Sequence, residues 1–235
     1  MFVNKLKPIE ITFFTSNPQV YEISRPMRAS KFLPDWFKNF QNQSVEPDPH
    51  PNLKHCRGLV DLYANGIMLP SWCEIRFDIG EIGSEFHTWQ FADWESRAEV
   101  HGKSQFPKQI KYDNLAHVKL FYPWRLVCKE EIQWSWQAPS WNDFDNFAYK
   151  VIPGVTEYKY QHNLHINLIF QRQLQSYKYL MKHNIPLAHL IPISSRRKIN
   201  IKYECVSDQE FNKLETPKVT FINNHLNQIK LRKGN

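Results

Sequence analysis

Several windows of the chain alternate apolar and polar residues with a period of two. In EEIQWSWQA (130–138), Ile132, Trp134 and Trp136 share one side, and CEIRFDI (73–79) and INIKYEC (199–205) have the same pattern. Side chains of a strand point alternately to opposite faces, so each window predicts a half-buried strand of an antiparallel sheet with one wet face. Further strands are predicted at Ile9–Phe14, Phe86–Phe91, Val118–Leu126 and Leu164–Phe170.

The composition favours the same fold class. Glycine is scarce, with 7 residues, whereas the chain has 15 prolines, 16 Phe, 10 Tyr and 8 Trp. Aromatic strands joined by proline-bearing loops fit this mixture better than a helical bundle. IPG (152–154) and HNIP (183–186) are interpreted as hairpin turns. The predicted fold is mainly β, an antiparallel sandwich or a partly rolled sheet.

Both ends of the chain differ from this β pattern. FLPDWFKNF (32–40) predicts a short helical turn whose aromatic residues form a docking face: Trp36, Phe37 and Phe40. Ser207 and Glu210 have the spacing of a capping box. Thr216 and Pro217 are interpreted as the start of a second C-terminal helix with an apolar stripe: Val219, Ile222, Leu226 and Ile229. The predicted organisation is an N-terminal strand and docking arm (1–50), a main β domain (51–206) and a C-terminal helical extension (207–235).

Histidines are the candidates for metal binding. In YQHNLHINLIF (160–170), His162 falls on the apolar face of the predicted strand, whereas His165 falls on the polar face between two asparagines. The two therefore cannot ligate one metal ion from this strand. A hydrogen-bonded strand histidine is the ordinary interpretation of His165. Candidate metal ligands are His87, His117 and His165.

The usual catalytic motifs are missing from the sequence. It contains no HExxH, GxGxxG or GxSxG motif. GKS (102–104) is a chance match, because a phosphate-binding loop needs glycine where this chain has Arg97. Asp61 is interpreted as a carboxylate that accepts backbone hydrogen bonds at a turn. The sequence therefore predicts no catalytic residue and no cofactor.

Cysteine usage and charge narrow the class of protein further. Four cysteines form no CxxC pair, which predicts reduced, mostly buried thiols. The net charge of +7 favours anionic partners, but the basic runs 194–198 and 230–235 are short and are typical of a solvated turn and tail. A nucleic-acid partner thus has weak support. The chain has no membrane-length apolar stretch and no secretory signal, so we expect no membrane association and a location in the cytoplasm.

Seven of the eight tryptophans lie between residues 72 and 141. Such a cluster fits either a core or a surface that stacks a sugar, a base or a protein loop. Trp134 and Trp136, beside Ile132, are assigned to the core. Three others, with polar or proline neighbours, are candidate partner-binding aromatics: Trp72, Trp94 and Trp141.

Six stretches occur in a characteristic order: KFLPDWFKN, CRGLVDLYANGIMLPSWCEI, WQF, FYPWRL, VIPGV and IPLAHLIPIS. This series, covering Lys31–Ser194, resembles an uncharacterised domain family found in cyanobacterial and tailed-phage genomes. Asn184 and Ile185 depart from the family, which tends to have glycine before the proline of the last stretch. The resemblance implies a phage-encoded protein. It implies no catalytic residue, because the family has no established activity.

Two interpretations of function follow. The first is a phage-encoded structural or protein-interaction module without catalytic activity, which binds a protein partner or further copies of itself in the host cytoplasm or the virion. The second is a small enzyme with an unrecognised, metal-dependent site on the polar face of the sheet. The missing motifs and the arm-like ends favour the first.

Overall fold

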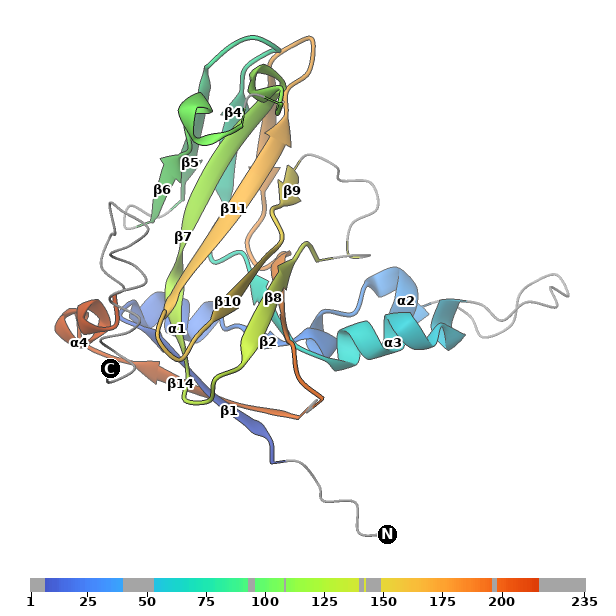
Figure 1. Cartoon of the computed structure of the whole chain (residues 1–235), viewed down its shortest axis with the longest axis vertical. Helices are drawn as coiled ribbons and strands as arrows, with labels where there is room; N and C mark the ends of the chain where they lie inside the picture. Colours follow the sequence, from blue (N-terminus) through green and yellow to red (C-terminus); the bar gives the residue numbers. More distant parts are fainter. Residues whose placement is uncertain are drawn as a thin grey trace, which may run out of the picture.

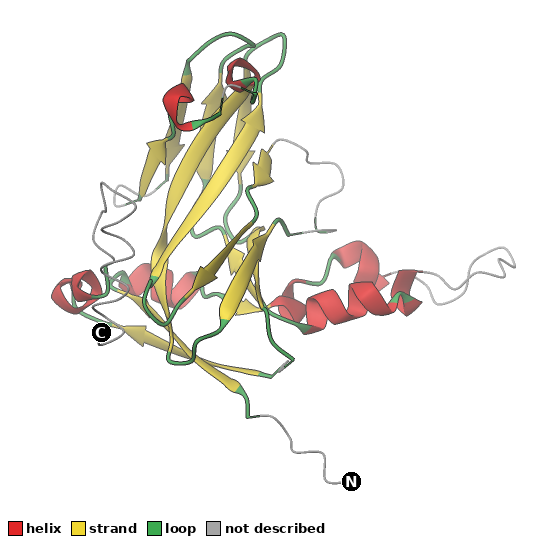
Figure 2. Cartoon of the chain, viewed as in Figure 1, coloured by secondary structure: helices red, strands yellow, loops and turns green. Residues whose placement is uncertain are grey.

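The structure is a computed structural model that describes residues 7–39, 53–92, 96–107, 109–139, 142, 149–195 and 198–215. It is mainly β, as predicted, with three sheets and a few short helices (Figures 1 and 2). Strands cover every window that the alternation predicted. The largest sheet has the order β14 (Ile199–Cys205), β1 (Ile9–Thr15), β7 (Leu115–Cys128), β11 (Asn163–Gln171), β9 (Tyr149–Val151). A further strand, β6 (Arg97–Val100), pairs with β7 on the same edge as β1.

Two smaller sheets accompany it. One has the order β10 (Gly154–Glu157), β8 (Gln133–Gln137), β13 (Pro186–Pro192), β3 (Ile67–Pro70), β2 (Met27–Arg28). The other has the order β12 (Tyr177–Met181), β4 (Ile75–Ile79), β5 (His87–Phe91). The pairings among the described strands are antiparallel apart from that of β1 with β14.

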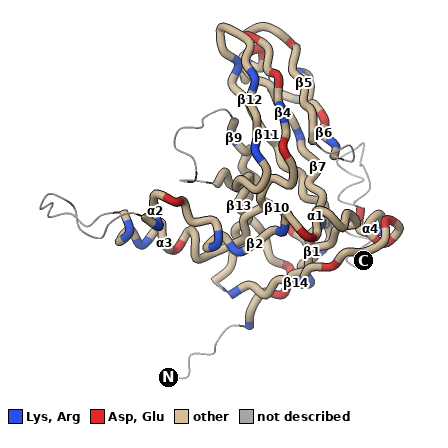
Figure 3. Tube along the Cα trace, turned by 180° about the vertical axis from the view of Figure 1, so that it is seen from behind, with Lys and Arg blue, Asp and Glu red and all other residues tan. Residues whose placement is uncertain are grey.

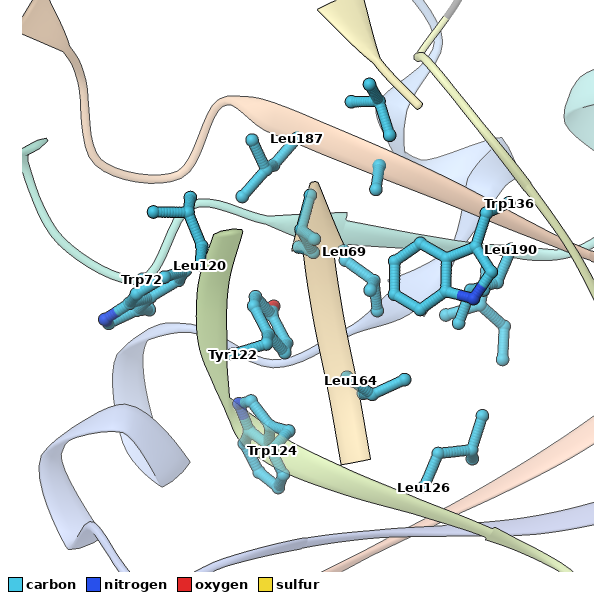
Figure 4. Close-up of a cluster of buried hydrophobic side chains, with 14 of the residues drawn as sticks. Leu69, Trp72, Leu120, Tyr122, Trp124, Leu126, Trp136, Leu164, Leu187 and Leu190 are labelled. Atoms are coloured by element: carbon cyan, nitrogen blue, oxygen red, sulfur yellow. The ribbon is translucent and has the colours of Figure 1, made fainter. Parts of the chain in front are cut away.

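The core lies on the inner face of the long β7–β11 pair. β11 alternates half-buried and buried residues along almost its whole length, as the sequence predicted. Figure 4 shows aromatic and leucine side chains from several strands meeting in this core, among them Trp72, Tyr122 and Trp136. The ring centroids of Phe77 on β4 and Phe170 on β11 are 4.7 Å apart, so the third sheet packs on the same face. The arrangement is sandwich-like.

Most helices lie outside this core, but the first of them contributes the buried Val20 to it. The helices are α1 (Pro18–Ile23), α2 (Asp35–Asn39), α3 (Arg57–Ala64) and α4 (Asp208–Lys213), with short 3₁₀ turns η1 (Ala29–Phe32), η2 (Leu53–His55), η3 (Lys103–Gln105) and η4 (Tyr112–Asn114). α2 confirms the predicted helical turn. The capping box is also confirmed: Ser207 Oγ accepts from the Glu210 backbone N–H at 3.3 Å, and the Glu210 carboxylate accepts from the Ser207 N–H at 3.1 Å. The helix predicted from Thr216 lies outside the described residues.

The interpretations of two turn segments, of Asp61 and of the cysteines were wrong. The 152–154 and 183–186 segments are not hairpin turns, because β9 and β10, and likewise β12 and β13, belong to different sheets. Proline and glycine mark a change of direction, but they do not say which strand pairs next. Asp61 lies in α3, where its carboxylate forms an ion pair with Arg57 one turn earlier, at 3.0 Å. Of the four cysteines, Cys56 and Cys205 are exposed, so the prediction of mostly buried thiols was also wrong.

No helix among the described residues is both long and apolar enough to cross a membrane.

Candidate functional site

The predicted aromatic docking face packs partly on its own chain. Trp36 and Phe37 on α2 are half-buried against a small second cluster that includes Phe32, Leu59 and Tyr63. The two rings meet edge to face, with centroids 5.7 Å apart. Much of the apolar surface of α2 is therefore already covered by α3 and η1, and α2 offers a partner only what remains exposed.

Trp72 is not a surface aromatic. Its side chain is 2% exposed, its ring meets Tyr122 edge-on at 5.3 Å, and its Nε1–H donates to Ser96 Oγ at 2.6 Å. Polar and proline neighbours in the sequence were a poor guide, because the residue follows the buried β3 directly into the core. Trp134 and Trp136 are buried, as predicted. The other partner-binding candidates lie outside the described residues: Phe40, Trp94, Trp141, Val219, Ile222, Leu226 and Ile229.

The three histidine candidates have three different surroundings. His87 on β5 faces Arg172, whose Nη2 lies 3.2 Å from His87 Nδ1, and a guanidinium at this distance repels a metal cation. His117 on β7 is 5% exposed, and its Nε2 lies 3.2 Å from Asn167 Oδ1. His165 on β11 contacts the ring of Phe121 edge-on, at 4.8 Å between centroids. Among the described residues, no group of three or more His, Cys, Asp or Glu side chains is placed to hold a metal ion.

His117 is held in a neutral, buried state. Its ring stacks on that of His101, with centroids 4.5 Å apart. Burial, together with the nearby His101, His87 and Lys119, lowers the pKa of His117 to about 4, and the hydrogen bond to Asn167 only partly offsets this shift. Burial also lowers the pKa of His87, and Arg172 adds to the effect. Both histidines thus oppose protonation in the folded protein.

This arrangement predicts a loss of stability in mild acid. The unfolded chain protonates His117 near pH 6.5 and the folded chain only near pH 4, so the free energy of unfolding should fall as the pH drops from about 6.5 to about 4, by about 3 kcal/mol from this residue. His117→Gln should flatten that slope. Urea unfolding at a series of pH values measures it, with the exposed His183→Gln as the matched control. An unchanged slope in His117→Gln would contradict the assignment.

The feature that the sequence analysis missed is a group of exposed apolar side chains at one end of the molecule. We call them the apolar tip: Ile82 (45% exposed), Phe86 (58%), Ile110 (40%) and Leu174 (88%). They belong to the β4–β5 loop, the loop before η4 and the β11–β12 loop, which meet at the top of Figure 1. Each is a lone apolar residue in a polar stretch, as in RQLQS (172–176), and this is the signal that could have revealed them.

Backbone hydrogen bonds join the β4–β5 and β11–β12 loops of the apolar tip to each other and to η4, which directly follows the third loop. The Ile82 N–H donates to the Gln173 carbonyl at 2.9 Å, and the Gly83 N–H donates to the Asp113 carbonyl at 3.1 Å. The Arg172 N–H donates to the Asn114 carbonyl at 2.8 Å. The loops are therefore fixed to one another and not only adjacent.

The buried side chain of Arg172 also connects these loops. Its side chain is 3% exposed, and its guanidinium donates to the carbonyls of Leu115 (3.1 Å), Gly80 (3.1 Å) and Phe86 (2.8 Å). These carbonyls belong to the start of β7 and to both ends of the β4–β5 loop. A buried charge without a carboxylate partner is costly unless dipoles satisfy it, and three carbonyls do so here. The apolar residues are thus presented on a rigid base.

No family model, curated protein or solved structure matches this chain.

Proposed function

We propose that this protein is a non-catalytic protein-interaction module that binds its partner through the apolar tip. The observation that carries the proposal is the gathering of four large, exposed apolar side chains on three loops that are hydrogen-bonded to one another. Single exposed apolar residues are ordinary, but several of them on adjoining loops at one end of a molecule favour an interface. A surface that is already ordered loses little conformational entropy when it binds.

The charges around the tip favour a protein partner. Glu81, Glu85 and Asp113 surround it together with Lys103 and Lys111, and all five are exposed. Carboxylates oppose contact with anionic lipid or nucleic acid, whereas a mixed polar rim around an apolar centre is the usual anatomy of a protein interface. Along the β12–β4–β5 sheet and α2–α3, basic and acidic residues are interspersed (Figure 3). The net charge of +7 is therefore not concentrated there as a phosphate-binding stripe would be.

The size of the tip favours repeated, weak contacts. Four side chains supply less surface than the roughly 800 Å² per partner of a standard interface. Such a contact becomes strong when many copies engage at once. This fits the phage-encoded structural module implied by the sequence resemblance, in which copies of the chain associate with one another or with other virion proteins.

Association of the purified chain tests the proposal. The double variant Phe86→Ser and Leu174→Ser should remove most of the self-association seen by sedimentation velocity, because it replaces the two most exposed apolar side chains of the tip. Ile193→Ser is the matched control, since Ile193 is 56% exposed but lies beyond β13.

Particles of the source phage, if the chain is phage-encoded, provide the second arm. Cross-linking mass spectrometry should place Lys103 and Lys111 at contacts with another virion chain. A full-length protein that is monomeric at high concentration and absent from particles would overturn the proposal, as would association that the double variant leaves unchanged.

A further inference from the structure

A cavity of about 300 Å³ lies beside β7 and β11 of the large sheet, and none of the apolar tip residues lines it. Its walls come from β7, β11 and the end of β8, and from β10 with the segment that links it to β9. The 158–161 segment between β10 and β11 and His101 after β6 complete the lining. β7 and β11 contribute Lys119, Asn163, His165 and Asn167, the half-buried residues of their outer faces, whose alternate neighbours are buried in the core. The cavity is therefore built on a rigid sheet and not on loops alone.

The polar side chains of the cavity are rich in hydrogen-bond donors. Gln161, Asn163 and Asn167 provide amides, His101 and His165 provide imidazoles, and Lys119 provides an ammonium group. No aspartate or glutamate is among the described residues that line it. A cavity with a cation, several N–H donors and no carboxylate on its walls suits an anion.

Lys119 is the cation at this site. Its side chain is 21% exposed, its ammonium is 3.7 Å from the Glu99 carboxylate, and it lies 5.0 Å above the ring of Phe121. Glu99 is outside the cavity lining and 42% exposed. A separation of 3.7 Å is long for a hydrogen-bonded ion pair, so the ammonium retains capacity for a second anionic partner.

Another part of the cavity wall is apolar. Trp136, Ile152, Pro153 and Val155 line it, and Val155 is 58% exposed. A ligand here would place an apolar or ring-shaped part against these side chains while its charged group meets Lys119. Ligand pockets usually combine such an apolar wall with a few placed polar groups.

Two wall residues carry buried oxygens without hydrogen-bond partners. One is Asn163 Oδ1, and the other is the hydroxyl of Tyr158, which is fully buried. The hydroxyl lies near Trp136 and Thr156 but lacks the geometry of a hydrogen bond to either. Burial raises the pKa of Tyr158 well above that of free tyrosine, so its proton stays in place and can be donated. Buried polar groups normally find partners. The Tyr158 hydroxyl can donate to an anionic oxygen, whereas Asn163 Oδ1 is an acceptor and needs a donor on the ligand, such as a hydroxyl group.

We propose that this cavity is a binding site for a small organic anion, with one carboxylate or phosphate group beside Lys119 and a ring or apolar part against Trp136 and Pro153. The site is independent of the apolar tip, so either can fail without the other.

Isothermal titration of the full chain tests the site with two anionic probes, benzoate and glucose 6-phosphate, and with their neutral counterparts, benzamide and glucose. At least one anion should bind more tightly than its counterpart, and which one does so distinguishes a carboxylate from a phosphate source. Lys119→Met should lower the affinity for that anion by about tenfold or more, which is the usual effect of losing one charge-assisted hydrogen bond. Lys178→Met, on the exposed side of β12, should leave it unchanged.

A second pair of variants avoids any effect on the Glu99 ion pair. Val155→Glu adds a carboxylate at an exposed wall position and should weaken anion binding, whereas the neutral Val155→Gln should not. Thermal unfolding of each variant confirms that the fold is retained. Absence of binding by all four probes would overturn the proposal, as would equal binding of anions and neutral counterparts or anion affinity that survives both Lys119→Met and Val155→Glu.

Discussion

Arg172→Met should destabilise the protein by about 3 kcal/mol or more, because it removes the hydrogen bonds that the buried guanidinium donates to three carbonyl groups. The guanidinium satisfies the carbonyls of Leu115, Gly80 and Phe86 and is itself 3% exposed. Methionine fills part of the same volume but donates nothing. The loss should show as a lower free energy of unfolding in urea, with an unchanged denaturant slope if the fold remains two-state.

Arg76→Met is the matched control for Arg172. Arg76 is exposed on β4 and forms a 3.4 Å ion pair with Asp78, and exposed pairs contribute at most about 1 kcal/mol. The Arg172 variant should also loosen the apolar tip before the rest of the molecule unfolds, because its hydrogen bonds join the tip loops to β7. If the free energy of unfolding falls as little in Arg172→Met as in the control, Arg172 does not hold the loops together.

Trp124→Ala should lower the free energy of unfolding by about 3–5 kcal/mol, which is the range for truncating a fully buried large aromatic side chain. Trp124 on β7 has no exposed surface, and its Nε1–H donates to the Ser24 carbonyl at 2.8 Å. Its ring meets Phe13 of β1 and Tyr203 of β14 with centroids 6.3 and 5.9 Å away. The substitution removes the side chain that packs three strands of the large sheet together and leaves the Ser24 carbonyl unpaired.

Trp89→Ala on β5 is the comparison for Trp124, since Trp89 is only partly buried. Thermal and urea unfolding should rank the two variants clearly. Because a domain of this size is stable by only about 5–15 kcal/mol, the Trp124 variant should lose a large part of its total stability. Similar losses for both variants would mean that the β1–β7–β14 contact contributes less than its burial indicates.

The strands could be predicted because alternation is a local property. Ile75, Phe77 and Ile79 are buried on β4, as are Trp134 and Trp136 on β8, because one face of each strand packs in the core. The capping box of α4 is equally local and was also predicted. The pairing of β1 with β14 joins segments about 190 positions apart in the chain and depends on the whole fold, so no window of sequence reveals it.

The candidate site was harder to predict for the same reason. His87, His117 and His165 were named as metal candidates, yet among the described residues no group of three or more His, Cys, Asp or Glu side chains is placed to hold a metal ion. Trp72 was assigned to the surface from its neighbours, although the path of the chain after β3 buries it. Leu174 and Phe86 become candidates for a binding surface only because loops distant in the sequence meet at one end of the molecule. Local patterns therefore predicted the elements, whereas the surface that they build required the fold.

Hydrogen exchange at the apolar tip, measured as a function of protein concentration, is the most direct test of the interaction proposal. Backbone amides of residues 80–86 and 172–176 should become more protected as the chain associates, whereas those beside Ile193 should not change. Protection that appears elsewhere while the tip amides exchange at an unchanged rate would contradict the proposal.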